Sequence, residues 1–212
     1  MNLTERDLKV IWHPYTQMQT AKPPVPIVRG DGALLFDEDG RSYIDAVSSW
    51  WVNIHGHAHP YIAQKVAAQL QQLEHVIFAG FTHPTAVELA ERLLHILPDN
   101  QKKVFYSDNG STAVEVALKM CLQFWSNQNR GRTKILAFHN AYHGDTFGAM
   151  AVSGRSAFTA PFDQLLFEVE FIDLPNESNL EHIKSHISQL RSELACFIYE
   201  PLVQGSGGML MY

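Results

Sequence analysis

Segments with helical periodicity alternate with short apolar runs from Pro60 to the end of the sequence. The periodic segments predict helices over residues 60–74, 84–97, 111–127 and 179–192. The apolar runs predict strands at residues 103–107, 134–138, 167–172 and 195–200. This alternation is typical of an α/β fold, in which helices cover both faces of a largely parallel sheet. In such sheets, ligands bind at the carboxyl ends of the strands.

Residues 1–60 follow a different pattern. A short helix is predicted near residues 5–11, and a hairpin is predicted from two arms, residues 33–36 and 42–47. We therefore divide the chain into an N-terminal segment and an α/β part that begins at residue 61.

Charge and composition exclude several classes of partner. The 212-residue chain has a net charge of −6, and its 16 Lys and Arg residues form no basic stripe, so no nucleic-acid partner is expected. Its apolar runs fall well short of the ~20 residues that a membrane-spanning helix needs, so no membrane partner is expected either. Cys121 on a helix and Cys196 in a strand are expected to be small buried side chains in a reducing compartment. The sequence thus predicts a cytoplasmic protein.

A candidate phosphate site follows the strand predicted at residues 103–107. Gly110 and Ser111 stand at the start of the next helix, where backbone N–H groups lack helical partners and the helix dipole is positive. Gly110 would let a ligand approach the backbone, and the Ser111 hydroxyl would add a donor. An alternative stays open, because a helix that begins with Ser or Thr is often only capped by it.

Two more polar loops follow predicted strands. Tyr142, in the loop after residues 134–138, could lay its ring on a planar ligand or close the edge of the core. Glu200, at the end of the last strand, could hold a polar group in a pocket or cap the loop beyond it. Because the carboxyl ends of parallel strands share one edge of the sheet, these loops are expected to form one site with Gly110 and Ser111.

Residues 49–60 combine the adjacent Trp50 and Trp51 with histidines at alternate positions, namely His55, His57 and His59. Histidines on one side of an extended segment suggest a metal site, but no Cys, Asp or Glu accompanies them, and no metal is expected. The two tryptophans could wall a binding pocket or pack the hairpin against a helical layer.

Taken in order, these runs resemble the class III aminotransferases, which are pyridoxal-phosphate enzymes of fold type I. The matching runs are residues 11–16, 48–51, 55–57, 108–115 and 142–146, followed by Glu200-Pro201 and Gln204-Gly205. The resemblance implies an α/β, PLP-dependent transferase fold of type I with an incomplete large-domain sheet. Residues 1–60 would be part of the small domain, and residues 61–212 would be the first half of the large domain.

Within the family, Trp-His-Pro-Tyr-Thr at residues 12–16 and Ser-Ser-Trp-Trp are similar to members that act in biotin synthesis. Those members move an amino group from S-adenosylmethionine to 8-amino-7-oxononanoate and give 7,8-diaminononanoate. The resemblance implies that Tyr15 and Trp50 contact the substrate. It also implies a homodimer, because loops of the partner subunit complete such sites.

The same resemblance assigns the cofactor contacts. Gly110 and Ser111 would bind the phosphate of pyridoxal 5′-phosphate. Tyr142 would stack on its ring and border the substrate, and Glu200 would lie near the cofactor.

The cofactor chemistry also needs a Schiff-base lysine and an acidic partner for the pyridinium nitrogen. In the family both lie beyond the segment that matches Tyr212. None of the lysines is predicted near the carboxyl ends of the strands; they are Lys9, Lys22, Lys65, Lys102, Lys103, Lys119, Lys134 and Lys184. No catalytic residue is therefore expected in this chain, which resembles the N-terminal half of a longer enzyme and is expected to be inactive alone. Residues 103–107 would then lack the strand with which they pair.

Two other functions stay open. One is a class III aminotransferase for another ω-amino acid or a diamine, against which Tyr15 and the Trp50-Trp51 pair argue. The other is a non-catalytic gene fragment that keeps a phosphate site.

Overall fold

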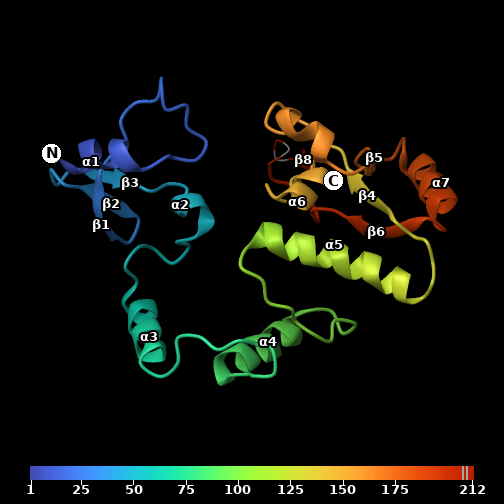
Figure 1. Cartoon of the computed structure of the whole chain (residues 1–212), viewed down its shortest axis with the longest axis horizontal. Coiled ribbons are helices and arrows are strands. Elements are labelled where there is room, and N and C mark those ends of the chain that lie inside the picture. Colours follow the sequence, from blue (N-terminus) through green and yellow to red (C-terminus); the bar gives the residue numbers. More distant parts are fainter. Residues whose placement is uncertain (207, 209) are drawn as a thin grey trace. The chain divides into compact units, whose positions relative to one another are not determined.

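The computed structural model describes residues 1–206, 208 and 210–212. Its contacts divide it into two compact units, residues 1–95 and residues 96–212 (Figure 1). Among the described residues, no helix combines the length and the apolar character needed to cross a membrane.

The first unit contains short helices and an antiparallel sheet of order β1-β2-β3. Its strands are β1 (Ile27–Asp31), β2 (Leu34–Asp37) and β3 (Ser42–Ile44). Its helices are α1 (Leu3–Val10), α2 (Ser48–Trp51), α3 (Pro60–Leu70) and α4 (Pro84–Ile96), the last of which crosses the boundary by one residue. The predicted hairpin and the three longer helices are confirmed, whereas β1 and α2 are elements that the sequence analysis missed.

The hairpin turn between β2 and β3 is organised by the buried carboxylate of Asp37. Its Oδ1 accepts the backbone N–H groups of Asp39 and Arg41 at 3.0 and 2.8 Å, and its Oδ2 accepts the Tyr43 hydroxyl at 2.7 Å. The bond from Tyr43, followed by these amide bonds, lowers the pKa of Asp37, against the opposing effect of burial. Gly40 has a φ of 80°, a conformation that glycine adopts without a steric penalty.

The first unit has no apolar core of its own. All of residues 1–95 are described, and Asp37 is the one buried residue among them. Every apolar side chain of this unit is at least partly exposed, so hydrophobic burial stabilises it little.

The second unit is a parallel α/β layer structure. Its sheet has the order β5-β4-β6, with β4 (Lys134–Phe138) in the centre between β5 (Glu170–Ile172) and β6 (Leu194–Ile198). Its helices are α5 (Gly110–Asn127), α6 (Phe147–Ala151) and α7 (Leu180–Leu190), with a 3₁₀ turn, η1 (Ala160–Leu165). A final two-stranded ladder joins β7 (Val203–Gln204) to β8 (Leu210–Met211).

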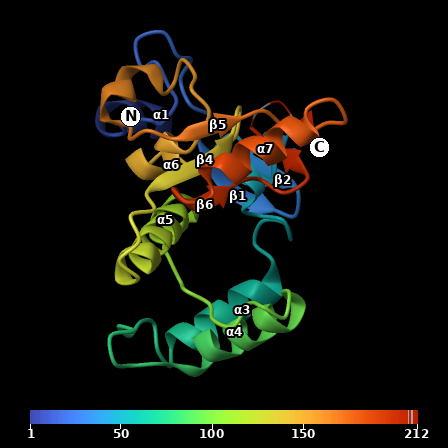
Figure 2. The same ribbon diagram turned by 90° about the vertical axis from the view of Figure 1, so that its right-hand side faces the viewer.

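Helices cover both faces of this sheet, as the alternating pattern predicts. On one face, Leu136 and Phe138 pack with Ile183 of α7. On the other, Ile135 packs with Leu118 of α5 and with Val152, which follows α6. Alternate residues of β4 thus point into two separate core clusters, and α5 and α7 lie on opposite sides of the sheet (Figure 2).

The strand predicted at residues 103–107 is wrong, because no strand forms there. A strand is stabilised by its neighbours, and none of the three strands in the parallel sheet pairs with this segment. Phe105 is 64% exposed as a consequence.

The cysteines also differ from the expectation of full burial. Cys121 on α5 and Cys196 on β6 are both only half-buried. Burial and the neighbouring Cys121 raise the pKa of the Cys196 thiol to about 12.

Candidate functional site

The start of α5 leaves two backbone donors open. Asn109 is the N-cap: its Oδ1 accepts the Thr112 N–H at 3.0 Å, and its own N–H donates to Thr112 Oγ1 at 3.2 Å. In the described part of the chain, no acceptor binds the N–H groups of Gly110 and Ser111. Capping and phosphate binding are therefore compatible, because Asn109 and Thr112 form the cap and leave the first two helical N–H groups to an anion.

There is also room for an anion at this position. A Cβ placed on Gly110 would meet no atom within 4 Å. A phosphate could therefore approach the open N–H groups closely, where the helix dipole adds partial positive charge.

The loop after β4 is joined to the same helix end. The Tyr142 hydroxyl donates to Asp145 Oδ2 at 2.8 Å, and the Asp145 N–H donates to Ser111 Oγ at 3.2 Å. Gly144, with a φ of 133°, permits this approach, because a Cβ there would lie 2.1 Å from Ser111 Oγ. The structure therefore brings Tyr142 and Ser111 together through Asp145.

Glu200 joins the third loop to this group. Its Oε2 accepts the Tyr142 N–H at 3.0 Å, and its Oε1 accepts the Gly205 N–H at 3.0 Å. The Tyr212 hydroxyl donates to its backbone oxygen. These contacts are those of a carboxylate that ties two loops together. Hydrogen bonds thus link the loops that hold Ser111, Tyr142 and Glu200 to one another.

His143 follows Tyr142 in the loop after β4, and its backbone N–H donates to Ser153 Oγ at 2.9 Å. Burial lowers the pKa of His143, against the opposing effect of the Glu200 carboxylate. Its imidazole therefore favours the neutral form beside the candidate site.

Sequence reasoning missed two carboxylates that support this site. Asp145 is the link between Tyr142 and Ser111 described above. Glu115, on α5, fixes the start of α6: its Oε1 accepts the Thr146 hydroxyl at 2.6 Å and the Gly148 N–H at 2.7 Å. Both residues stand inside the runs that carried the family resemblance, so their polar character within those runs was the available signal.

In the first unit, the structure brings Tyr15 and Trp50 together. Their ring centroids lie 5.4 Å apart at an interplanar angle of 68°, an edge-to-face contact. Both residues are largely exposed, at 69% and 61%. Both residues have positive φ, at 52° and 58°, which costs a non-glycine residue about 1–2 kcal/mol.

The three alternate histidines do not share one environment. His57 Nε2 forms a hydrogen bond with Asp45 Oδ2 at 2.7 Å. The rings of His55 and His59 instead lie edge to face, with their centroids 6.2 Å apart. No group of three or more potential metal ligands occurs within the described residues.

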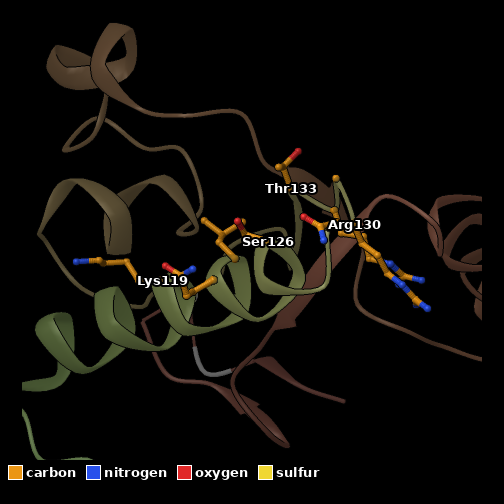
Figure 3. Close-up of a pocket in the computed structure, with 9 residues that line it drawn as sticks. Lys119, Ser126, Arg130 and Thr133 are labelled. Atoms are coloured by element: carbon orange, nitrogen blue, oxygen red, sulfur yellow. The ribbon is translucent and has the colours of Figure 1, made fainter.

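A surface hollow of about 700 Å³ lies at the far end of α5 from Gly110 and Ser111. Its lining includes Lys119, Ser126, Arg130 and Thr133 (Figure 3). The Lys119 and Arg130 side chains extend in opposite directions there, so their charges do not converge on a common point (Figure 3). This hollow is remote from the group of loops around Tyr142 and is not the candidate site.

Comparison with known proteins identifies what this arrangement is similar to. A family model, "Aminotransferase class-III", matches residues 15–212. An adenosylmethionine-8-amino-7-oxononanoate aminotransferase of Synechococcus elongatus is 52% identical over 211 residues, which are 95% of this chain and 50% of that protein.

The solved structures that the chain resembles are also aminotransferases. The crystal structure of an adenosylmethionine-8-amino-7-oxononanoate aminotransferase from Methanocaldococcus jannaschii matches with a TM-score of 0.92 at 39% identity, covering 99% of this chain and 49% of that one. A PLP-bound amine transaminase from an uncultivated Pseudomonas species matches with a TM-score of 0.83 at 32% identity, covering 95% and 50%. The chain therefore spans about half the length of these relatives.

Proposed function

Since this chain belongs to the class III aminotransferases, which depend on pyridoxal 5′-phosphate, we propose that it forms the phosphate-holding half of such an enzyme. The observation that carries the proposal is the pair of open N–H groups at Gly110 and Ser111, linked through Asp145 to Tyr142. The space beside the Gly110 Cα is open, so no side chain there obstructs a phosphate group.

Each residue of the site has a task in this proposal. Gly110 and Ser111 bind the phosphate through backbone N–H groups, and the Ser111 hydroxyl can donate while its oxygen accepts from Asp145. Tyr142 borders the cofactor ring, its orientation fixed by Asp145 at the hydroxyl and by Glu200 at the backbone. Glu200 acts near the cofactor by holding this loop. When bound, the cofactor supplies an electron sink that allows an amino group to pass from one substrate to another.

For the substrates, we propose S-adenosylmethionine as amino donor and 8-amino-7-oxononanoate as acceptor, giving 7,8-diaminononanoate in biotin synthesis. The names of the relatives from Synechococcus elongatus and Methanocaldococcus jannaschii support this choice. The aromatic pair of Tyr15 and Trp50 supports it too, as an amphipathic surface for a largely aliphatic substrate.

The catalytic lysine is proposed to lie outside these residues. Lys134 is paired with Glu193 at 2.9 Å, at the opposite end of β4 from Tyr142, and Lys184 is paired with Glu181 on α7. The matched relatives are twice as long, which leaves room for the lysine and the acidic partner in a second half. We further propose that this chain alone is an inactive fragment, and that the whole enzyme is a cytoplasmic homodimer.

An assay of the full-length protein tests the proposal. The full-length protein is expected to convert 8-amino-7-oxononanoate to 7,8-diaminononanoate with S-adenosylmethionine as donor, detected by mass spectrometry. Turnover only with other ω-amino acids or diamines in a substrate panel would assign the chain to a different class III activity. A stop codon directly after the codon for Tyr212 would instead support a non-catalytic gene fragment.

A further inference from the structure

The backbone of α2 is left-handed, which is unusual for residues other than glycine. Ser48, Ser49, Trp50 and Trp51 have φ angles of 49°, 49°, 58° and 68°, so four consecutive residues other than glycine occupy the left-handed region. Side chains of L-residues clash with the following carbonyl in this conformation. Such a run persists only where surrounding contacts determine it, and it is typical of functional segments.

Asp45 supplies the contacts at the start of this turn. Its Oδ1 accepts the Ser49 N–H at 3.0 Å, and its Oδ2 accepts the Ser49 hydroxyl at 2.8 Å. Its backbone oxygen accepts the Ser48 N–H at 3.2 Å. One aspartate therefore binds both residues that open the left-handed turn.

His57 connects Asp45 to the antiparallel sheet. Its Nε2 bonds to Asp45 Oδ2 at 2.7 Å, and the two side chains are only 16% and 6% exposed. The His57 backbone exchanges two hydrogen bonds with Gly32, at 2.8 and 3.2 Å. A Cβ on Gly30 would lie 2.6 Å from the His57 Cβ, so the sheet leaves the histidine little freedom to move.

The third residue of the turn is Trp50, whose ring contacts Tyr15 at 5.4 Å. The direction of the Trp50 side chain depends on the hand of the turn, because a right-handed turn would place its Cβ on a different side of the backbone. The contacts that determine the left-handed conformation of the turn therefore also place the indole of Trp50 against Tyr15.

We propose that Asp45, together with Ser49 and His57, is a positioning residue for the aromatic surface that Trp50 and Tyr15 present to the substrate. We call these three residues the Asp45 clamp. The inference rests on the proposed function, in which that surface binds substrate. The clamp does not touch the reacting atoms, so its loss weakens substrate binding while the chemical step continues.

Steady-state kinetics of the full-length enzyme test the clamp. Asp45→Asn is expected to raise KM by about tenfold and to leave kcat within about twofold, because binding is lost without loss of chemistry. In a Trp50→Ala background, the same substitution is expected to change KM by less than about twofold, since the two changes remove one interaction. An equal effect of Asp45→Asn in both backgrounds would overturn the proposal.

Two further variants control for general damage. Asp31→Asn makes the same charge change at an exposed position on β1 and is expected to leave KM unchanged. Ser49→Ala keeps the backbone bond to Asp45 and removes the hydroxyl bond, so it folds more readily and is expected to raise KM by about threefold. An unchanged KM in Ser49→Ala and Asp45→Asn alike contradicts the clamp.

A readout without substrate separates this inference from the proposed function. 5-Fluorotryptophan at position 50 is assigned in the full-length protein by the ¹⁹F resonance that the Trp50→Phe variant lacks. Asp45→Asn and Tyr15→Ala are both expected to shift this resonance, and Asp31→Asn is not. A resonance that Asp45→Asn leaves in place overturns the clamp. Absence of amino transfer by the unsubstituted enzyme, with the expected shifts present, contradicts only the proposed function.

Discussion

At the scale of single residues, Gly110 is the position where ligand binding and folding are most clearly separate. Its side-chain position faces open space at the first residue of α5, and Ala is a better helix former than Gly. Gly110→Ala should therefore fold as well as the unsubstituted protein, while its methyl group obstructs the phosphate.

We expect Gly110→Ala to weaken binding of pyridoxal 5′-phosphate by the full-length protein about tenfold or more, which corresponds to about 1.4 kcal/mol. The measurement is an absorbance titration with the cofactor, combined with a thermal unfolding midpoint. Gly131→Ala, near the other end of α5 and also facing open space, is the matched control and should bind the cofactor normally. Equal cofactor affinity in both variants would argue against a phosphate at Gly110.

Asp45 gives a prediction on pH dependence. Its bonds from the Ser49 backbone and hydroxyl, followed by His57, lower its pKa to about 2. A carboxyl group whose folded pKa is depressed stabilises the fold above its unfolded pKa of ~3.9, and the stabilisation is lost as the pH falls toward 2. The unfolding midpoint of the unsubstituted protein should therefore fall more steeply below pH ~4 than that of Asp45→Asn. Parallel pH profiles of the two proteins would contradict the low pKa.

At the scale of elements, sequence patterns predicted those parts whose formation depends on local signals. Proline at the start of α4 and the aspartate-rich turn of the hairpin are examples, as is the apolar run of β4. The prediction of a strand at residues 103–107 failed, because a strand forms only by pairing with a neighbouring strand, and that neighbour is distant in sequence. The left-handed α2 carries no glycine that would signal its conformation, which depends on Asp45.

The candidate site likewise combines features that the sequence predicts with features that only the structure reveals. The positions of Tyr142 and Glu200 in loops after strands of the parallel sheet could be predicted from the order of elements, whereas residues 103–107, before Gly110 and Ser111, form no strand. The identity of the cap could not, because Asn109 and Thr112 compete with Ser111 for that role and only geometry decides between them. The proposed assignment of residues 1–60 to a small domain depends likewise on contacts beyond local sequence.

Glu115 provides a test at this scale, because it fixes the start of α6. A neutral amide replaces the charged acceptor of the Thr146 hydroxyl and the Gly148 N–H, so Glu115→Gln should lower the free energy of unfolding by about 1–3 kcal/mol. Denaturant unfolding of the full-length protein measures the change. Glu177→Gln, at an exposed position, is the control and should have little effect. No loss of stability in Glu115→Gln would show that α6 forms without this carboxylate.

At the scale of the whole molecule, the two units differ in how much apolar surface they bury. The second unit has two core clusters around β4, and the first has no buried apolar side chain. Residues 103–107 also form no strand. These features are what the proposal expects, in which other parts of a longer protein cover these surfaces; the relatives that the chain matches are about twice its length.

This contrast predicts the behaviour of residues 1–212 expressed alone. They should be poorly soluble, and in the soluble fraction the amides of β1–β3 should exchange with deuterium at least about tenfold faster than those of β4–β6. Hydrogen exchange followed by mass spectrometry gives the comparison. Equal protection of both sheets would show that the first unit is stable without further contacts.

The central proposal is that this chain holds the cofactor phosphate of the biotin-pathway aminotransferase, and that the reactive lysine lies outside residues 1–212. The most direct test measures 7,8-diaminononanoate formed from S-adenosylmethionine and 8-amino-7-oxononanoate, by the full-length protein and by residues 1–212, under the same conditions. The account predicts product from the full-length protein and none from residues 1–212. Product formed by residues 1–212 alone, or none formed by the full-length protein, would contradict it.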